Sequence, residues 1–280
     1  MSRTGYLIIL LLMMPVATSA AHFSFKNVHS GVYAALAEPG GKAESNSMIV
    51  VTRYQVILAG AHFKPETLKE LLDFVKTVTP LPVRYIILTH HHRGFKQVDF
   101  DLPRNVEIIV SGPTWSALKS ESRQITNPVT IFDRYLTLKR DATLLVLNAT
   151  ERAHTSGDVF VYLPEERVLF TSDLVFNNVV GSMGDAGFRD WSSALEMLIK
   201  INARTIIPGL GAVTTTDGII QFQTFFRAFT TEVLQFTNTE TAFDTARQQF
   251  SLKQYEKLPG FGKYFESNFK RAYDELKALK

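Results

Sequence analysis

Three adjacent histidines, His90, His91 and His92, are the residues whose type and spacing most clearly indicate chemistry. They follow the near-continuous apolar run of residues 83–88, which is typical of a buried strand. α/β proteins place their ligands at the carboxyl ends of such strands. In an extended turn, alternate side chains point the same way, so His90 and His92 can hold one ion while His91 points elsewhere. The spacing therefore predicts part of a metal site.

Two further segments contain residues that complete the set. His154 comes just before an expected strand at residues 159–163, and Asp173 closes an expected strand at 168–171. A single histidine or aspartate in a loop is more often a capping or surface residue, so the argument depends on all four together. Three imidazoles and a carboxylate, in a chain without cysteine, suit a borderline divalent metal such as zinc. The predicted metal ligands are His90, His92, His154 and Asp173, and the predicted catalytic residues are Asp173 and His154.

The elements that must position these residues follow an α/β pattern. Apolar segments at residues 48–52 and 55–59 flank a turn and predict a hairpin. Pro65 stands at the first position of a helix that extends to about Val78. With the strand at 83–88, this order of elements forms a βαβ unit.

The remaining chain continues this pattern. Further strands are expected at residues 31–36, 106–110, 135–138, 143–147, 159–163, 168–171 and 205–207. A short helix is expected near Trp115 and an amphipathic helix at 191–201, and the chain after Gly211 has a mostly helical pattern. No internal repeat or linker divides these elements. We therefore expect an α/β fold in a single domain, with two β-rich halves and helices outside.

The N-terminus and the composition narrow the class of protein. Arg3, an apolar run at residues 6–14 and small residues at 17–20 predict a signal peptide at 1–20, and hence a periplasmic or secreted domain at 21–280. Its C-terminal part, from about residue 213, is expected to be helical. The absence of cysteine excludes disulfides, thiolate ligands and a cysteine nucleophile. A net charge of +3 is too weak to indicate binding to nucleic acid or, after signal cleavage, to a membrane.

Four motifs resemble, in order, those of the metallo-β-lactamase superfamily. They are Thr89-His90-x-His92, Ala153-His154-Thr155-x-Gly157-Asp158, Leu169-Phe170-Thr171-Ser172-Asp173 and Pro208-Gly209-Leu210-Gly211. The C-terminal residues Pro259-Gly260-Phe261, Asn268 and Arg271-Ala272-Tyr273-x-Glu275-Leu276 are similar to the tail of its periplasmic, cyclase-like and quinoprotein-relay members. The resemblance implies a four-layer αββα sandwich with metals in a groove at its edge. It also implies that His90, His92 and His154 bind the first ion and that Asp173 bridges to the second.

The chain departs from the family at the positions of the second ion. The family pattern T-H-x-H-x-D-H has Gly94 and Phe95 here in place of its aspartate and last histidine, and the histidine of the late P-G-H-G motif is Leu210. None of these side chains can ligate a divalent ion, so we expect at most one metal ion. The Asp-x-Gly motif of the family is replaced by the neighbourhood of Gly60.

Three functions remain open at this point. The first is a mononuclear zinc hydrolase of an ester, thioester, lactone or amide, because one zinc ion still activates water. The second is a non-catalytic member whose groove binds a ligand or partner, with a structural metal or none. The third follows from a resemblance to the persulfide dioxygenases of the superfamily, in which His90, His154 and Asp173 would hold iron. A serine hydrolase is excluded because Gly-x-Ser-x-Gly does not occur.

Several other residues are expected to have structural roles. His22, His29 and His62 are interpreted as residues of surface loops, with a place near the mouth of the groove as the alternative. The segment at 181–184, rich in glycine, is predicted to be a flexible loop of the groove, since no Lys-Ser/Thr pair follows it as in a phosphate-binding loop. The aromatic residues at helical spacing are expected in the core or an interface, and these are Phe222, Phe225, Phe226 and Phe229.

Overall fold

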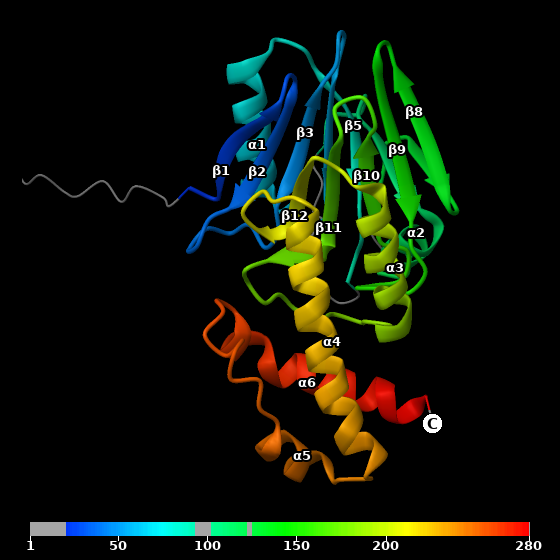
Figure 1. The fold of residues 1–280 in the computed structure, drawn as a ribbon. Coiled ribbons are helices and arrows are strands. Elements are labelled where there is room, and N and C mark those ends of the chain that lie inside the picture. The colour runs from blue at the N-terminus through cyan, green and yellow to red at the C-terminus, as the bar shows by residue number, and fades with distance from the viewer. Residues whose placement is uncertain (1–20, 93–101, 122–124, 280) are drawn as a thin grey trace, which may run out of the picture.

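The computed structural model describes residues 21–92, 102–121 and 125–279 (Figure 1). The predicted signal peptide at 1–20 therefore lies outside the described residues, as do Gly94 and Phe95. None of the helices within the described ranges is long and apolar enough to span a membrane.

The first sheet contains seven of the described strands in chain order. They are β1 (Phe23–His29), β2 (Val32–Ala37), β3 (Ser47–Val51), β4 (Val56–Gly60), β5 (Val83–Leu88), β6 (Glu107–Ser111) and β7 (Val129–Phe132). Strands β1 to β4 pair antiparallel, whereas β4 to β7 are parallel. The carboxyl ends of the parallel strands consequently meet at one edge, and the histidine triplet follows β5 there.

The second sheet contains five described strands in the order β12-β11-β10-β9-β8. They are β8 (Tyr135–Arg140), β9 (Thr143–Ala149), β10 (Val159–Leu163), β11 (Val168–Asn177) and β12 (Thr205–Gly211). All pairs are antiparallel except β11 with β12, which are parallel across the helix that joins them. The two sheets lie face to face in Figure 1.

Helices cover the outer faces of both sheets. In the described chain they are α1 (Pro65–Val78), α2 (Gly112–Lys119), α3 (Phe188–Ile201), α4 (Thr216–Asn238), α5 (Phe243–Gln249) and α6 (Phe261–Ala278). Pro65 begins α1, and Leu68, Leu71 and Val75 form its buried stripe, as the spacing predicts. Helix α6 crosses α4 beyond the ends of the strands (Figure 1).

Three apolar clusters hold these layers together. One lies between the sheets, where residues such as Val50 and Ile87 meet Leu147 and Phe170. A second packs α1 and α2 on the first sheet, and a third packs α3 to α6 on the second. Helix, sheet, sheet and helix thus form the four layers that the resemblance implies, so the α/β fold class is confirmed. The third cluster includes the predicted core aromatics of α4.

Most sequence-predicted elements are confirmed, and β11 is the instructive exception. The strand was expected to close at Asp173 but continues to Asn177. Ser172 adopts a left-handed backbone (φ 48°), and the register with β12 shifts on both sides of it. Such a bulge redirects the strand without ending it. Asp173 therefore lies within a strand, next to a bulge that turns its side chain toward the sheet edge. The edge strand β1, which has a mostly polar sequence, was not predicted.

Candidate metal centre

The four predicted ligands come together at the edge where the two sheets meet. His90 and His92 follow β5, His154 precedes β10, and Asp173 lies in β11. The two sheets are joined at this point because the amide of Val159 donates to the carbonyl of Thr89 at 2.7 Å. All four side chains are buried. Residues separated by more than 80 positions in the sequence therefore share one site.

The atoms of these side chains converge on a small volume. The Nε2 atoms of His90 and His154 each lie 3.7 Å from Oδ2 of Asp173. The Nε2 atoms of His92 and His154 are 2.9 Å apart. Ligand atoms of one tetrahedral zinc ion are separated by about 3.3–3.4 Å, since each lies about 2.0–2.1 Å from the metal. The observed separations bracket this value, and the ligand atoms of His90, His154 and Asp173 all lie within 4.8 Å of one another. These three residues therefore fit a single ion of that size, and His92 lies beside them through its contact with His154.

Buried polar atoms without partners support the same interpretation. Among the described residues, Nε2 of His90 and Oδ1 of Asp173 are buried and have no hydrogen-bond partner. A buried polar group without a partner costs free energy unless a ligand, ion or water satisfies it. A metal ion bound by Nε2 of His90 would remove that cost for the imidazole. The observation therefore fits a cation-binding role.

Burial also sets the protonation state of the imidazoles. Desolvation lowers the pKa of His90 well below its ordinary value of 6.5, and the neighbouring His154 lowers it further. The pKa of His154 is lowered by burial and by His92. Both imidazoles are therefore neutral at pH 7, which is the form that binds a metal. Burial also raises the pKa of Asp158 to about 7, against hydrogen bonds from Thr155 that lower it.

The side chains around His90 fix its orientation. Thr89 and Ser172 hydroxyls are hydrogen-bonded at 2.8 Å, and each lies 3.4 Å from Nδ1 of His90. His91 faces away from the site, as predicted, with its Nε2 3.1 Å from Oε1 of Glu121. Contacts on Nδ1 leave Nε2 of His90 directed into the site, which is how outer residues orient metal-binding histidines.

Two glycines allow other segments to pack closely on the ligands. A Cβ on Gly184 would lie 2.5 Å from Cε1 of His92 and 2.9 Å from the carbonyl of His154. A Cβ on Gly209 would lie 2.3 Å from Oδ1 of Asp173. The predicted groove loop at 181–184 thus lies directly against the histidines. Only glycine permits these approaches, because any larger side chain would occupy the volume of a ligand.

Two buried asparagines hold segments of the site in place through hydrogen bonds, and the local sequence around them does not predict this role. Asn46 donates from Nδ2 to the carbonyls of Pro208 and Gly211 at 2.8 and 2.9 Å, which ties the first sheet to β12. Asn268 of α6 accepts from the amide of Met183 at 2.7 Å and donates to the carbonyl of Gly181 at 3.0 Å. Helix α6 therefore holds the loop that packs on His92. This contact gives the C-terminal motif a structural role.

His62 was expected in a surface loop, and that expectation is wrong. Its side chain is only 7% exposed, and Nε2 lies 3.6 Å from Oδ2 of Asp173. Its ring is parallel to that of His92, with centroids 6.0 Å apart. A signal was present in the sequence. In the predicted βαβ unit His62 follows β4 as His90 follows β5, and parallel strands end at the same edge.

A cavity of about 470 Å³ opens above these residues. Its walls include His62, His92, His154, Asp173, Leu210 and, from α6, Lys263, Tyr264 and Ser267. Leu210 lines the cavity at the position where the family has a second-site histidine. The structure therefore shows an apolar side chain in the groove at this position.

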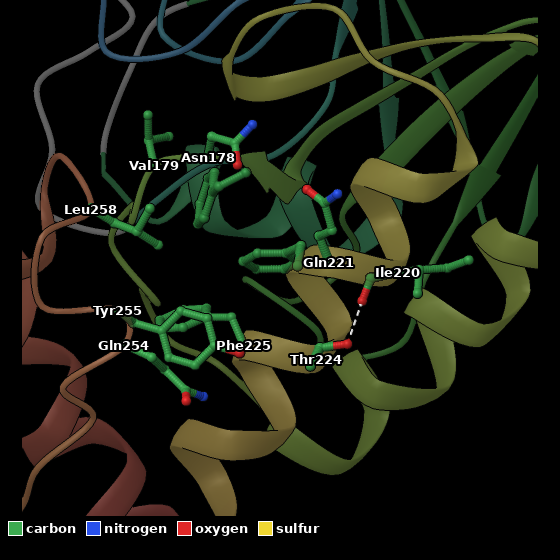
Figure 2. A pocket seen from close by; sticks show the side chains of 11 residues that line it. Asn178, Val179, Ile220, Gln221, Thr224, Phe225, Gln254, Tyr255 and Leu258 are labelled. Atoms are coloured by element: carbon green, nitrogen blue, oxygen red, sulfur yellow. Dashed lines mark hydrogen bonds between the residues drawn. The ribbon is translucent and has the colours of Figure 1, made fainter.

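A second hollow, of about 330 Å³, lies between α4 and the segment before α6 (Figure 2). Figure 2 shows Phe225, Tyr255 and Leu258 around it, with Gln221 and Asn178 near its rim. None of the residues that line it is acidic, basic or a histidine. This hollow therefore lacks the groups that metal-dependent chemistry requires, and the first cavity is the candidate site.

The comparisons with known proteins bear on the family and the fold. A family model described as the metallo-beta-lactamase superfamily matches residues 104–210, which include His154 and Asp173. Metallo-beta-lactamase IND-1 of Chryseobacterium indologenes is 25% identical over 190 residues, covering 65% of this chain and 78% of that protein. Metallo-beta-lactamase type 2 of Bacteroides fragilis is 24% identical over 196 residues, covering 68% and 78%.

Solved structures have the same fold. A metallo-beta-lactamase from Pontibacter korlensis superposes with a TM-score of 0.63 at 23% identity, covering 73% of this chain and 99% of that one. The DIM-1 metallo-beta-lactamase has a TM-score of 0.63 at 15% identity, covering 74% and 98%. With the ordered motifs and the clustered ligands, these similarities lead to one conclusion. Residues 104–210 of this chain match the metallo-beta-lactamase superfamily, and the described chain has the metallo-beta-lactamase fold.

Proposed function

We propose that this protein is an exported hydrolase that uses one zinc ion, held by His90, His92, His154 and Asp173, to cleave an ester, thioester, lactone or amide. Similarity to a family of metal-dependent hydrolases supports the reaction class. The observation that carries the proposal is the convergence of the Nε2 atoms of His90 and His154 on Oδ2 of Asp173, at 3.7 Å each. The substitution of Leu210 for a second-site histidine supports one ion instead of two.

The roles of the residues follow from their chemistry. A zinc ion in this set would polarise a substrate carbonyl and activate water near neutral pH. Asp173 keeps Oδ1 without a hydrogen-bond partner among the described residues, so this oxygen is available to accept a proton from the attacking water. Lys263 and Ser267 line the same cavity from α6 and offer a cation and a hydroxyl to polar groups of the substrate.

The metal content of the purified mature protein tests the proposal. We expect about one zinc per chain by elemental analysis, lost in His90→Ala because a buried ligand is removed. The matched control is His29→Ala, whose side chain is exposed outside the cavity and which should keep the zinc. Absence of bound metal in protein purified under zinc-replete conditions would contradict the proposal. Iron in place of zinc would support the dioxygenase alternative instead.

A hydrolysis screen then separates an enzyme from a binding protein. The zinc-loaded protein should cleave at least one member of a panel that contains nitrocefin, aryl esters, thioesters and lactones. Loss of that activity in His90→Ala, with retention in His29→Ala, would link cleavage to the site. A fully zinc-loaded protein that cleaves nothing in the panel would favour the non-catalytic alternative, for which the apolar Leu210 in the groove is the supporting observation.

The proposed export of the protein is tested by the cleavage of its predicted signal peptide. The apolar run at residues 6–14, followed by small residues at 17–20, supports cleavage before Ala21. Protein recovered from the periplasm or medium of a bacterial host should have the intact mass of residues 21–280. Replacing three apolar residues of the run by aspartate should leave the protein in the cytoplasm with all 280 residues. An exported protein of full length would contradict the proposal.

A further inference from the structure

His62 lies beside Asp173 and lines the same cavity as Leu210. Its Nε2 lies 3.6 Å from Oδ2 of Asp173, nearly the same distance as the Nε2 atoms of His90 and His154. Three imidazole nitrogens therefore surround one carboxylate oxygen. His62 also forms, with His90 and His92, a group whose ligand atoms lie within 4.8 Å of one another.

The backbone explains why His62 reaches this place. Strands β4 and β5 are parallel, and Gly60 is paired with Leu88. His62 and His90 each come two residues after this pair, so both leave the same sheet edge at the same level. The carbonyl of His62 accepts from the amide of Lys64 at 3.1 Å at the start of α1. The buried ring of Phe63 anchors the next position. The position of His62 is therefore set by the fold.

The neighbours of His62 are those of a metal-binding histidine. On one side Nε2 faces Asp173, and on the other Nδ1 lies 3.9 Å from Oε2 of Glu44. A carboxylate near the second ring nitrogen orients a metal-binding imidazole and raises its basicity. Its ring also lies edge-on to that of His90, with centroids 5.1 Å apart. An imidazole placed among three others, each directed at the same volume, suits coordination better than packing in an apolar core.

We propose that His62 is a further ligand of the same metal ion, in the cavity where Leu210 stands at the position of the family's second-site histidine. This inference rests on the proposed metal site. The chain would thus lack the histidine that binds the second ion in the family, and would have His62 as an additional ligand of the single ion. Imidazole and carboxylate donors suit zinc and other borderline divalent ions, and hydrolysis would require one of these five donors to give up its position to water.

Metal affinity of His62→Ala tests the inference. Competition with a chromophoric chelator should show zinc binding at least about 100-fold weaker than in the wild type, because loss of even an outer contact to a ligand costs about 10–100-fold. Cobalt(II) bound in place of zinc should show a changed visible absorption spectrum, because the spectrum depends on the number of ligands. His29→Ala is the control and should match the wild type in both measurements. Circular dichroism of the metal-free variants checks the fold.

The outcomes distinguish this inference from the proposed function. Unchanged zinc affinity and cobalt spectrum in His62→Ala, with binding lost in His154→Ala, would overturn the role of His62 and leave the proposed site intact. Two ions in the wild type and one in His62→Ala would overturn the assignment to the same ion. Failure of the wild type to bind zinc would overturn the proposed function itself. If His62→Ala does not fold, His62→Gln keeps a polar side chain of similar length and should show the same loss of affinity.

Discussion

Replacing Asp173 by alanine is expected to lower kcat/KM by about 10²–10⁴-fold for the substrate that the hydrolysis screen identifies, which is the contribution of a positioned acid–base group. Its Oδ2 lies 3.6–3.7 Å from the Nε2 atoms of His62, His90 and His154. Removing the carboxylate takes away a ligand and a proton acceptor together. The measurement is steady-state kinetics at saturating zinc, with the zinc content of each sample determined in parallel.

The conservative variant Asp173→Asn separates the two roles. Asparagine preserves the size of the side chain but cannot accept a proton, so kcat should fall even in samples that still hold one zinc. A variant that loses zinc as well shows that Asp173 is needed for binding. Full activity in Asp173→Asn would contradict a role of Asp173 in proton transfer, and would leave Asp173 as a structural neighbour of the histidines.

Gly209→Ala should destabilise the protein strongly, because Gly209 packs directly on Asp173. The new Cβ would lie 2.6 Å from Cα and 2.7 Å from the amide nitrogen of Asp173, as well as 2.3 Å from its Oδ1. Backbone atoms of two paired strands cannot rotate away, so β11 and β12 must separate. Overpacking of this kind costs about 1–3 kcal/mol, and we expect the upper end of that range in urea denaturation. The displaced carboxylate should also weaken zinc binding.

Gly262→Ala is the matched control for this substitution. Gly262 lies in α6, and a Cβ there would meet nothing within 4 Å. Alanine is favoured over glycine in a helix by about 1 kcal/mol, so this variant should be as stable as the wild type or more stable. A Gly209→Ala protein with wild-type stability and zinc affinity would contradict the view that the Pro208-Gly209 segment packs on Asp173.

The fold and the residues that the structure brings together at the sheet edge were predictable from the sequence, because both follow from short-range patterns. The spacing of Leu68, Leu71 and Val75 predicts the buried face of α1, and the apolar run at 83–88 predicts a central strand. Alternation in an extended turn separates His91 from its two neighbours, and the structure places His91 against Glu121. These features depend on residues within a few positions of each other.

Contacts between residues far apart in the sequence, which hold the candidate site in place, were not predictable from such local patterns. Asn46 contacts β12 across more than 160 positions, and nothing in its local sequence distinguishes it from a turn residue. The sequence predicts that the strand ends at Asp173, whereas β11 continues to Asn177 through Ser172, which has a left-handed backbone. A bulge depends on pairing with neighbouring strands, so the sequence of one strand does not reveal it.

The sequence by itself therefore determined the residue types that can hold a metal, the strands they follow and the family that the chain resembles. The tertiary structure alone decided which of these side chains share one volume. His62 is the clearest case, because it lies 28 positions before His90 and has no motif of its own. It reaches Asp173 because the pairing of Gly60 with Leu88 brings the ends of two parallel strands to one edge. Distances between ligands are set by strand register and sheet packing, which a linear pattern does not encode.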